Sequence, residues 1–136
     1  MYRILVCDDE KDIVSALKIY LMADGYQVFE AYNGREALEI LKNEDIHLVL
    51  MDIMMPVMNG YEAAKMIRSL EREDAKKVPI IAMTANAFTE DRIRAKEAGM
   101  DEHVAKPVDV KLLVKVISRL VGNNLGGIRN EKEKME

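Results

Sequence analysis

The chain has 136 residues, 49% of them hydrophobic and 32% charged, and a net charge of -4. This size and balance fit a single globular domain, and the interspersed acids and bases do not indicate a surface for nucleic acid or a membrane. Cys7 is the only cysteine, which excludes an internal disulfide framework and favours a reducing, cytoplasmic setting. The sequence contains neither an apolar run near the ~20 residues of a membrane span nor the layout of a signal peptide.

Short apolar segments alternate along the chain with segments of helical periodicity. We expect strands over residues 3–7, 26–32, 47–52, 79–85 and 102–106. We expect five helices, over residues 12–25, 33–41, 60–70, 89–99 and 109–120, where apolar residues recur every three or four positions. Residues 1–121 then form one domain, and residues 122–136, rich in Gly and Asn and then charged, form a flexible tail.

This alternation predicts an α/β fold with a parallel sheet that has helices on both faces, joined by right-handed crossovers. Periodicity does not give the order of the strands. The order 2-1-3-4-5, which is that of flavodoxin-like doubly wound folds, would bring the carboxyl ends of strands 1, 3, 4 and 5 together. Ligands of such sheets bind at that edge.

Polar residues follow four of the five expected strands. Asp8 and Asp9 follow the first, Asp52 ends the third, Thr84 ends the fourth and Lys106 ends the fifth. Carboxylates that lie close together require a proton or a cation between them, and a set of oxygen ligands suits Mg²⁺. A carboxylate beside Mg²⁺, with an ammonium and a hydroxyl in reach, is equipped to accept a phosphoryl group as the nucleophile.

Each of these residues also has an ordinary structural explanation. Asp8 and Asp9 can favour the start of the next helix, Thr84 can simply end a strand, and Lys106 can be a solvated loop charge. Their joint occurrence at four strand ends favours a shared site.

Two other classes of protein fit the sequence less well. A dehalogenase-type phosphatase needs a second acid two residues after its nucleophile, where this chain has Met54, and a flavodoxin-like electron carrier needs a hydroxyl-rich loop and flavin-stacking aromatics, where this chain has "CDDEKD" and no Trp.

Four segments, "ILVCDDE", "LVLMDIMMPVMNGYEA", "PIIAMTANA" and "EAGMDEHVAKPV", resemble the successive signatures of the receiver domains of two-component response regulators. The resemblance covers residues 2–121, and the domain resembles the receivers of chemotaxis proteins. It implies that Asp52 accepts a phosphoryl group, and that the domain is a signalling module rather than an enzyme, although it assists its own phosphorylation and dephosphorylation.

The resemblance also implies a role for each matching position. Mg²⁺ would be bound by Asp9, Asp52 and the backbone carbonyl of Met54, with Asp8 acting through water. Lys106, Thr84 and the backbone N–H of Ala85 would contact the phosphoryl oxygens. The bond between Lys106 and Pro107 is expected to be cis, as X-Pro bonds permit.

One position departs from the family pattern. His103 stands where the family has Tyr or Phe, the aromatic residue that moves inward with Thr84 and switches the face made by helix 4, strand 5 and helix 5. An imidazole packs like a ring but also titrates, so we expect His103 either to serve as the switch or to be an exposed strand residue. His47 is expected at the surface.

The resemblance implies partners as well. The phosphoryl donor would be a histidine kinase or a histidine phosphotransfer protein, and the output a protein target, with no direct nucleic-acid or membrane partner. Met54, Met55 and Met58 are expected to contact the donor. We expect a single-domain regulator without a DNA-binding output, or alternatively a receiver domain excised from a hybrid histidine kinase or a larger regulator.

Overall fold

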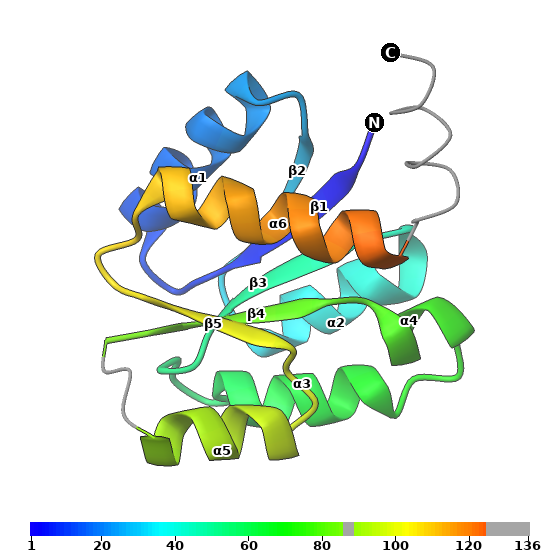
Figure 1. The fold of residues 1–136 in the computed structure, drawn as a ribbon. Helices are drawn as coiled ribbons and strands as arrows, with labels where there is room; N and C mark the ends of the chain where they lie inside the picture. Colours follow the sequence, from blue (N-terminus) through cyan, green and yellow to red (C-terminus); the bar gives the residue numbers. More distant parts are fainter. Residues whose placement is uncertain (86–88, 125–136) are drawn as a thin grey trace.

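The computed structural model describes residues 1–85 and 89–124 (Figure 1). Five parallel strands form one sheet in the order β2-β1-β3-β4-β5, which confirms the predicted topology. The strands are β1 (Arg3–Cys7), β2 (Gln27–Ala31), β3 (Leu48–Asp52), β4 (Ile80–Thr84) and β5 (Glu102–Ala105). The helices are α1 (Lys11–Ala23), α2 (Gly34–Asn43), α3 (Gly60–Arg68), α4 (Glu73–Lys77), α5 (Thr89–Glu97) and α6 (Val110–Asn124).

Helices α1 and α6 cover one face of the sheet, and α2, α3 and α5 cover the other (Figure 1). The strands β1 to β4 contribute side chains alternately to two cores, so that Leu48 and Leu50 face α1 and α6 while Val49 and Met51 face the opposite layer. The central strands β3 and β4 are buried along their whole length, which explains their unbroken apolar sequences. Within the described residues, no helix has the length and apolarity needed to cross a membrane.

Two asparagines define the starts of the middle helices. Asn59 forms a complete capping box with Glu62, because its side chain accepts the Glu62 N–H and the Glu62 carboxylate accepts the Asn59 N–H. Asn33 accepts the N–H of Glu36 in the same way, but the Glu36 carboxylate accepts the N–H of Tyr32. The capping box at the start of α2 is therefore only half formed.

The structure corrects two expectations about the helices. Six helices rather than five lie in the described residues, because α4 forms within the segment between α3 and β4. A helix of five residues is too short to produce a recognisable periodicity. In addition, α6 (Val110–Asn124) continues beyond the range of 109–120 expected for the last helix. The rest of the expected tail, residues 125–136, lies outside the described residues.

Candidate functional site

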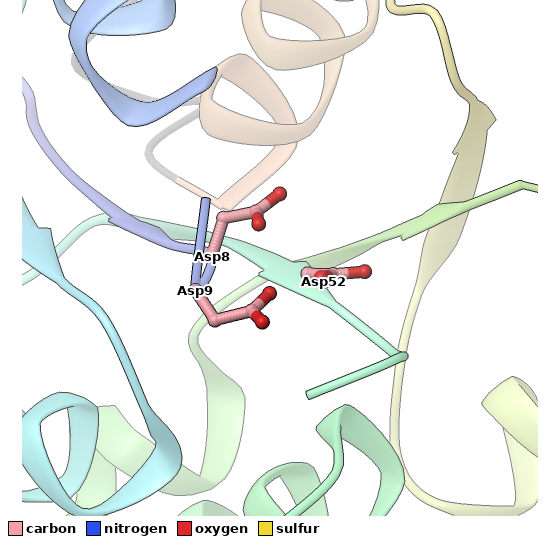
Figure 2. Close-up of side chains that lie close together, drawn as sticks. All are labelled: Asp8, Asp9 and Asp52. Atoms are coloured by element: carbon pink, nitrogen blue, oxygen red, sulfur yellow. The ribbon is translucent and has the colours of Figure 1, made fainter. Parts of the chain in front are cut away.

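Three carboxylates lie together at the carboxyl edge of the sheet (Figure 2). Asp8 and Asp9 directly follow β1, and Asp52 is the last residue of β3, the strand that pairs with β1. One oxygen from each of the three lies within 4.8 Å of the others. Asp8 and Asp52 are buried, with 0% and 3% of their surface exposed, whereas Asp9 is exposed. The acids predicted to share a site therefore do so.

Lys106 completes this group from the far strand of the sheet. Its Nζ lies 2.8 Å from Oδ2 of Asp8 and 3.3 Å from Oδ1 of Asp52. The backbone N–H of Lys106 donates to the carbonyl of Thr84, which ties the loop after β5 to the end of β4. The bond between Lys106 and Pro107 is cis, as predicted. The Lys106 ammonium thus faces two buried carboxylates.

The hydrogen bonds of the two buried acids leave one oxygen poorly satisfied. The Met54 N–H donates to Oδ1 of Asp52 at 3.1 Å, and the Glu10 N–H donates to Oδ1 of Asp8 at 3.0 Å. Oδ2 of Asp8 depends on Lys106, 2.8 Å away, and has no further partner among the described residues. Three carboxylates beside one ammonium leave an excess of negative charge, and such a set of oxygen ligands fits a divalent cation.

The electrostatics of the site follow from this geometry. Burial, together with the charge of Asp8, raises the pKa of the Asp52 carboxyl from its ordinary value of 3.8 to about 6, against the opposing effects of the Met54 N–H and Lys106. Burial alone would lower the pKa of Lys106, but Asp8 and Asp52 outweigh it and raise that pKa. A cation beside Asp52 would favour the charged carboxylate, which is the nucleophilic form.

Gly60 places the loop that follows Asp52. Its N–H donates to the carbonyl of Ile53, and a Cβ on Gly60 would lie 2.5 Å from the carbonyl oxygen of Asp52 and 2.7 Å from Cα of Ile53. Such distances are shorter than a real Cβ contact allows. Only glycine permits the start of α3 to approach the end of β3 this closely.

The remaining predicted residues lie around the same edge. Thr84 is buried at the end of β4, and Ala85 follows it with its surface exposed. His103 lies on β5 opposite Ala82, and its Nδ1 is 3.7 Å from a carboxylate oxygen of Glu102. Thr84 and His103 line one small cavity beneath α5, together with Tyr61. His103 is therefore a half-buried neighbour of Thr84 and not a fully exposed strand residue.

Two expectations about individual side chains are wrong. Met55 is buried and Met58 packs against Gly34, so of the three methionines expected at a partner surface only Met54 is exposed. His47 is half buried, because its Nδ1 accepts the Arg3 N–H at 2.9 Å and its ring contacts Tyr2 edge-on. The spacing of residues in the sequence does not show that the loop with Met55 and Met58 folds back onto the core. It also does not show that His47 pairs with Arg3, which is 44 residues away.

Sequence reasoning also missed the contacts of the lone cysteine. The Cys7 thiol donates to the carbonyl of Asn33 and lies 3.7 Å from Sδ of Met55. Burial and the neighbouring acids, Asp8 above all, raise the pKa of this thiol far above its ordinary value. The thiol therefore stays protonated and packs behind the acidic cluster, as expected for a small core residue.

Comparisons with known proteins agree with this arrangement. Residues 4–118 match the model of the response regulator receiver domain. The response regulator SaeR of Staphylococcus aureus is 36% identical over 121 residues, which are 89% of this chain and 51% of SaeR. The chain thus spans about half the length of SaeR.

Solved structures are similar over nearly their whole length. The chemotaxis protein CheY4 of Vibrio cholerae has a TM-score of 0.84 and 30% identity, over 88% of this chain and 98% of CheY4. The receiver domain of sensor histidine kinase PA1611 from Pseudomonas aeruginosa has a TM-score of 0.81 and 33% identity, over 89% of this chain and 98% of that one, and was solved with a magnesium ion coordinated in its active site cleft. With its family match, its sheet order and its acidic cluster, the chain belongs to the family of response regulator receiver domains, the signalling modules of two-component systems.

Proposed function

We propose that Asp52 accepts a phosphoryl group from a phosphohistidine of a histidine kinase or a histidine phosphotransfer protein. The observation that carries this proposal is the convergence of Asp8, Asp9 and Lys106 on the Asp52 carboxylate from two other strand ends. A structural ion pair alone does not account for three acids and one cation at this edge.

The step is a transfer between a nitrogen and an oxygen. An oxygen of Asp52 forms a bond to phosphorus while the bond from phosphorus to the donor histidine breaks, and the nitrogen keeps the bonding electrons. The product is an acyl phosphate. Such transfers need positioning and charge stabilisation more than further covalent chemistry. The Met54 N–H fixes Oδ1 of Asp52, which leaves the other oxygen to attack.

Three acidic side chains are the proposed cation ligands. Asp9 and Asp52 would bind Mg²⁺ together with the Met54 carbonyl, and Asp8 would act through water. When bound, Mg²⁺ neutralises charge on the oxygens of the transferring group. The magnesium ion in the receiver domain of PA1611 supports this assignment.

Lys106, Thr84 and Ala85 are proposed to contact the phosphoryl oxygens. Lys106 is already within 3.3 Å of Asp52, so it needs little movement to reach a group attached there. Thr84 and the Ala85 N–H stand at the end of the neighbouring strand. We further propose that His103, which shares a cavity with Thr84, passes the change to the face formed by α5, β5 and α6.

We propose that the receiver domain acts on a protein target in the cytoplasm without binding nucleic acid or membrane directly. Two arrangements fit this role, namely a regulator made of this domain alone and a receiver domain within a larger protein. The match to about half of SaeR and the similarity to the receiver domain of the sensor histidine kinase PA1611 favour the second arrangement.

The test is phosphorylation by a small donor. Incubation with Mg²⁺ and acetyl phosphate should add the mass of one phosphoryl group, and Asp52→Ala or removal of Mg²⁺ with EDTA should abolish the gain. Asp12→Ala, which removes an exposed acid of α1 outside the cluster, is the matched control and should be modified normally. A mass gain that persists in Asp52→Ala would show that another residue is the acceptor.

A further inference from the structure

A groove of about 740 Å³ lies on the side of the molecule away from the acidic cluster, between the end of α3, α4, the second half of α5 and the start of β5. Five basic side chains line it, namely Arg68, Lys76, Lys77, Arg92 and Lys96. They come from three helices that are separate in the sequence. This concentration of positive charge contrasts with the net charge of -4 of the whole chain.

Arg68 forms the floor of the groove and is not available to a ligand. Its guanidinium donates to the carbonyls of Gly99 and Val78, both at 2.7 Å, and forms an ion pair with Asp101 at 3.0 Å. These bonds tie the end of α3 to the segments that precede β4 and β5. The groove is therefore a built feature of the fold with a fixed floor.

The other cations are exposed and largely uncompensated. Lys77, Arg92 and Lys96 form no ion pair with any other described residue, and Lys76 has only an exposed contact with Glu73 at 3.5 Å. The two acids that line the groove are already paired, Asp101 with Arg68 and Glu102 with Arg119. Four solvated cations on one concave surface favour an anionic occupant.

We propose that this groove binds an acidic segment of a partner protein, with Lys77, Arg92 and Lys96 pairing individually with its carboxylates. A volume of about 740 Å³ fits a short stretch of polypeptide. Ala95 and Met100 add an apolar floor for the aliphatic parts of such a segment.

The chemistry of the groove favours a peptide over a nucleic acid. Single-stranded nucleic acids are held by aromatic platforms as well as by charge, and the described residues that line the groove include no Phe, Tyr or Trp. The negative charge of the rest of the chain opposes a long polyanion or an anionic membrane, whereas a short acidic segment stays within the local field.

The position of the groove connects it to the phosphorylation site. Arg92, Ala95 and His103 line both the groove and the small cavity that Thr84 also lines. A role of the groove as an output surface rests on the proposed function. The binding of an acidic segment to the groove is independent of that function. Asp52→Ala should accordingly bind such a segment as the unmodified protein does.

The test uses a short fluorescein-labelled oligoglutamate peptide and fluorescence anisotropy at low ionic strength. Lys77→Glu combined with Lys96→Glu should weaken binding by about tenfold or more. Lys42→Glu combined with Lys65→Glu, which changes two exposed lysines outside the groove by the same charge, should alter the affinity by less than about twofold. Circular dichroism of all variants verifies folding.

Three outcomes would overturn the inference. The first is no binding of the peptide by the unmodified protein. The second is equal weakening in both charge-reversal pairs, which would indicate a general charge effect. The third is tighter binding of an oligothymidine of equal charge than of the peptide, which would assign the groove to nucleic acid. If the unmodified protein binds the peptide but is not phosphorylated by acetyl phosphate, the proposed function is wrong and the proposed role of the groove still holds.

Discussion

Burial determines how the ionisable residues of this protein behave. Asp8 and Asp52 lose their contact with water, and Lys106 offsets part of the cost because it faces both. His47 is half buried for a different reason, since its Nδ1 accepts a backbone N–H from Arg3 and its ring contacts Tyr2 edge-on. At the acidic cluster and at His47, the surroundings in the folded protein therefore favour one protonation state of the side chain over the other.

We predict that His47 makes folding stability depend on pH below about 6.5. Burial, assisted by the charge of Arg3, lowers the pKa of His47 below its ordinary value of 6.5. The unfolded chain therefore binds a proton before the folded protein does. The stabilisation from neutral His47 is complete above pH 6.5 and declines as the pH falls from there through the lowered pKa.

Urea unfolding at pH 7.5 and at pH 5.5 measures this effect. The decrease in the free energy of unfolding between the two values should be smaller in His47→Gln than in the unmodified protein. The comparison cancels the contributions of the carboxylates, including Asp52, which both proteins share. An equal decrease in the two proteins would mean that His47 does not titrate differently on folding.

At the scale of secondary structure, the junction between β3 and α3 is the most constrained part of the site. Asn59 and Glu62 fix the first turn of α3 by reciprocal hydrogen bonds, and Gly60 brings that turn against the backbone of Asp52. The orientation of the end of β3 therefore depends on the start of a helix. We expect stability and cation binding to be coupled at this junction.

We predict that Gly60→Ala lowers the free energy of unfolding by about 2–3 kcal/mol, because backbone atoms at 2.5 and 2.7 Å must move. Gly25→Ala is the comparison, since Gly25 has a φ of +93° but no atom within 4 Å of its Cβ position. Its cost of about 1–2 kcal/mol comes from the backbone conformation alone. Only Gly60→Ala should also weaken Mg²⁺ binding, as measured by isothermal titration. An unchanged Mg²⁺ affinity in Gly60→Ala would show that the junction between β3 and α3 does not influence cation binding.

At the scale of the whole molecule, the sheet order brings together residues that are far apart in the chain. The acidic cluster joins the ends of β1 and β3, and Lys106 reaches it from the end of β5. On the other side of the molecule, Arg68 connects three segments beneath the basic groove. Negative and positive sites therefore occupy separate regions of one small domain.

We predict that Mg²⁺ stabilises the folded protein, because the unfolded chain does not hold the three carboxylates together. A Mg²⁺ concentration about 100 times the Kd should raise the free energy of unfolding by about 2.7 kcal/mol. Asp9→Asn should lose most of this increase, measured by urea unfolding with Mg²⁺ and with EDTA. Glu10→Gln, an adjacent exposed acid outside the cluster, should retain it. An equal loss in both variants would indicate nonspecific ion binding.

Local sequence patterns predicted all five strands and the five long helices, because burial on both faces requires unbroken apolar strands and burial on one face requires helical spacing. The same patterns placed Asp8, Asp9, Asp52, Thr84 and Lys106 at strand ends. They did not predict α4, which is too short to show a period. They also misplaced Met55 and Met58, since a loop has no period that distinguishes inward from outward side chains.

Local patterns in the sequence specify the five strands, the five longer helices and the residue types at their ends. The tertiary structure decided which of those residues meet, because strand order, the pairing of His47 with Arg3 and the meeting of α3, α4 and α5 around the basic groove are contacts between distant segments. Hydrophobic periodicity reports that a face is covered and not what covers it. The acidic site was therefore predictable once a strand order was assumed, whereas the basic groove was not.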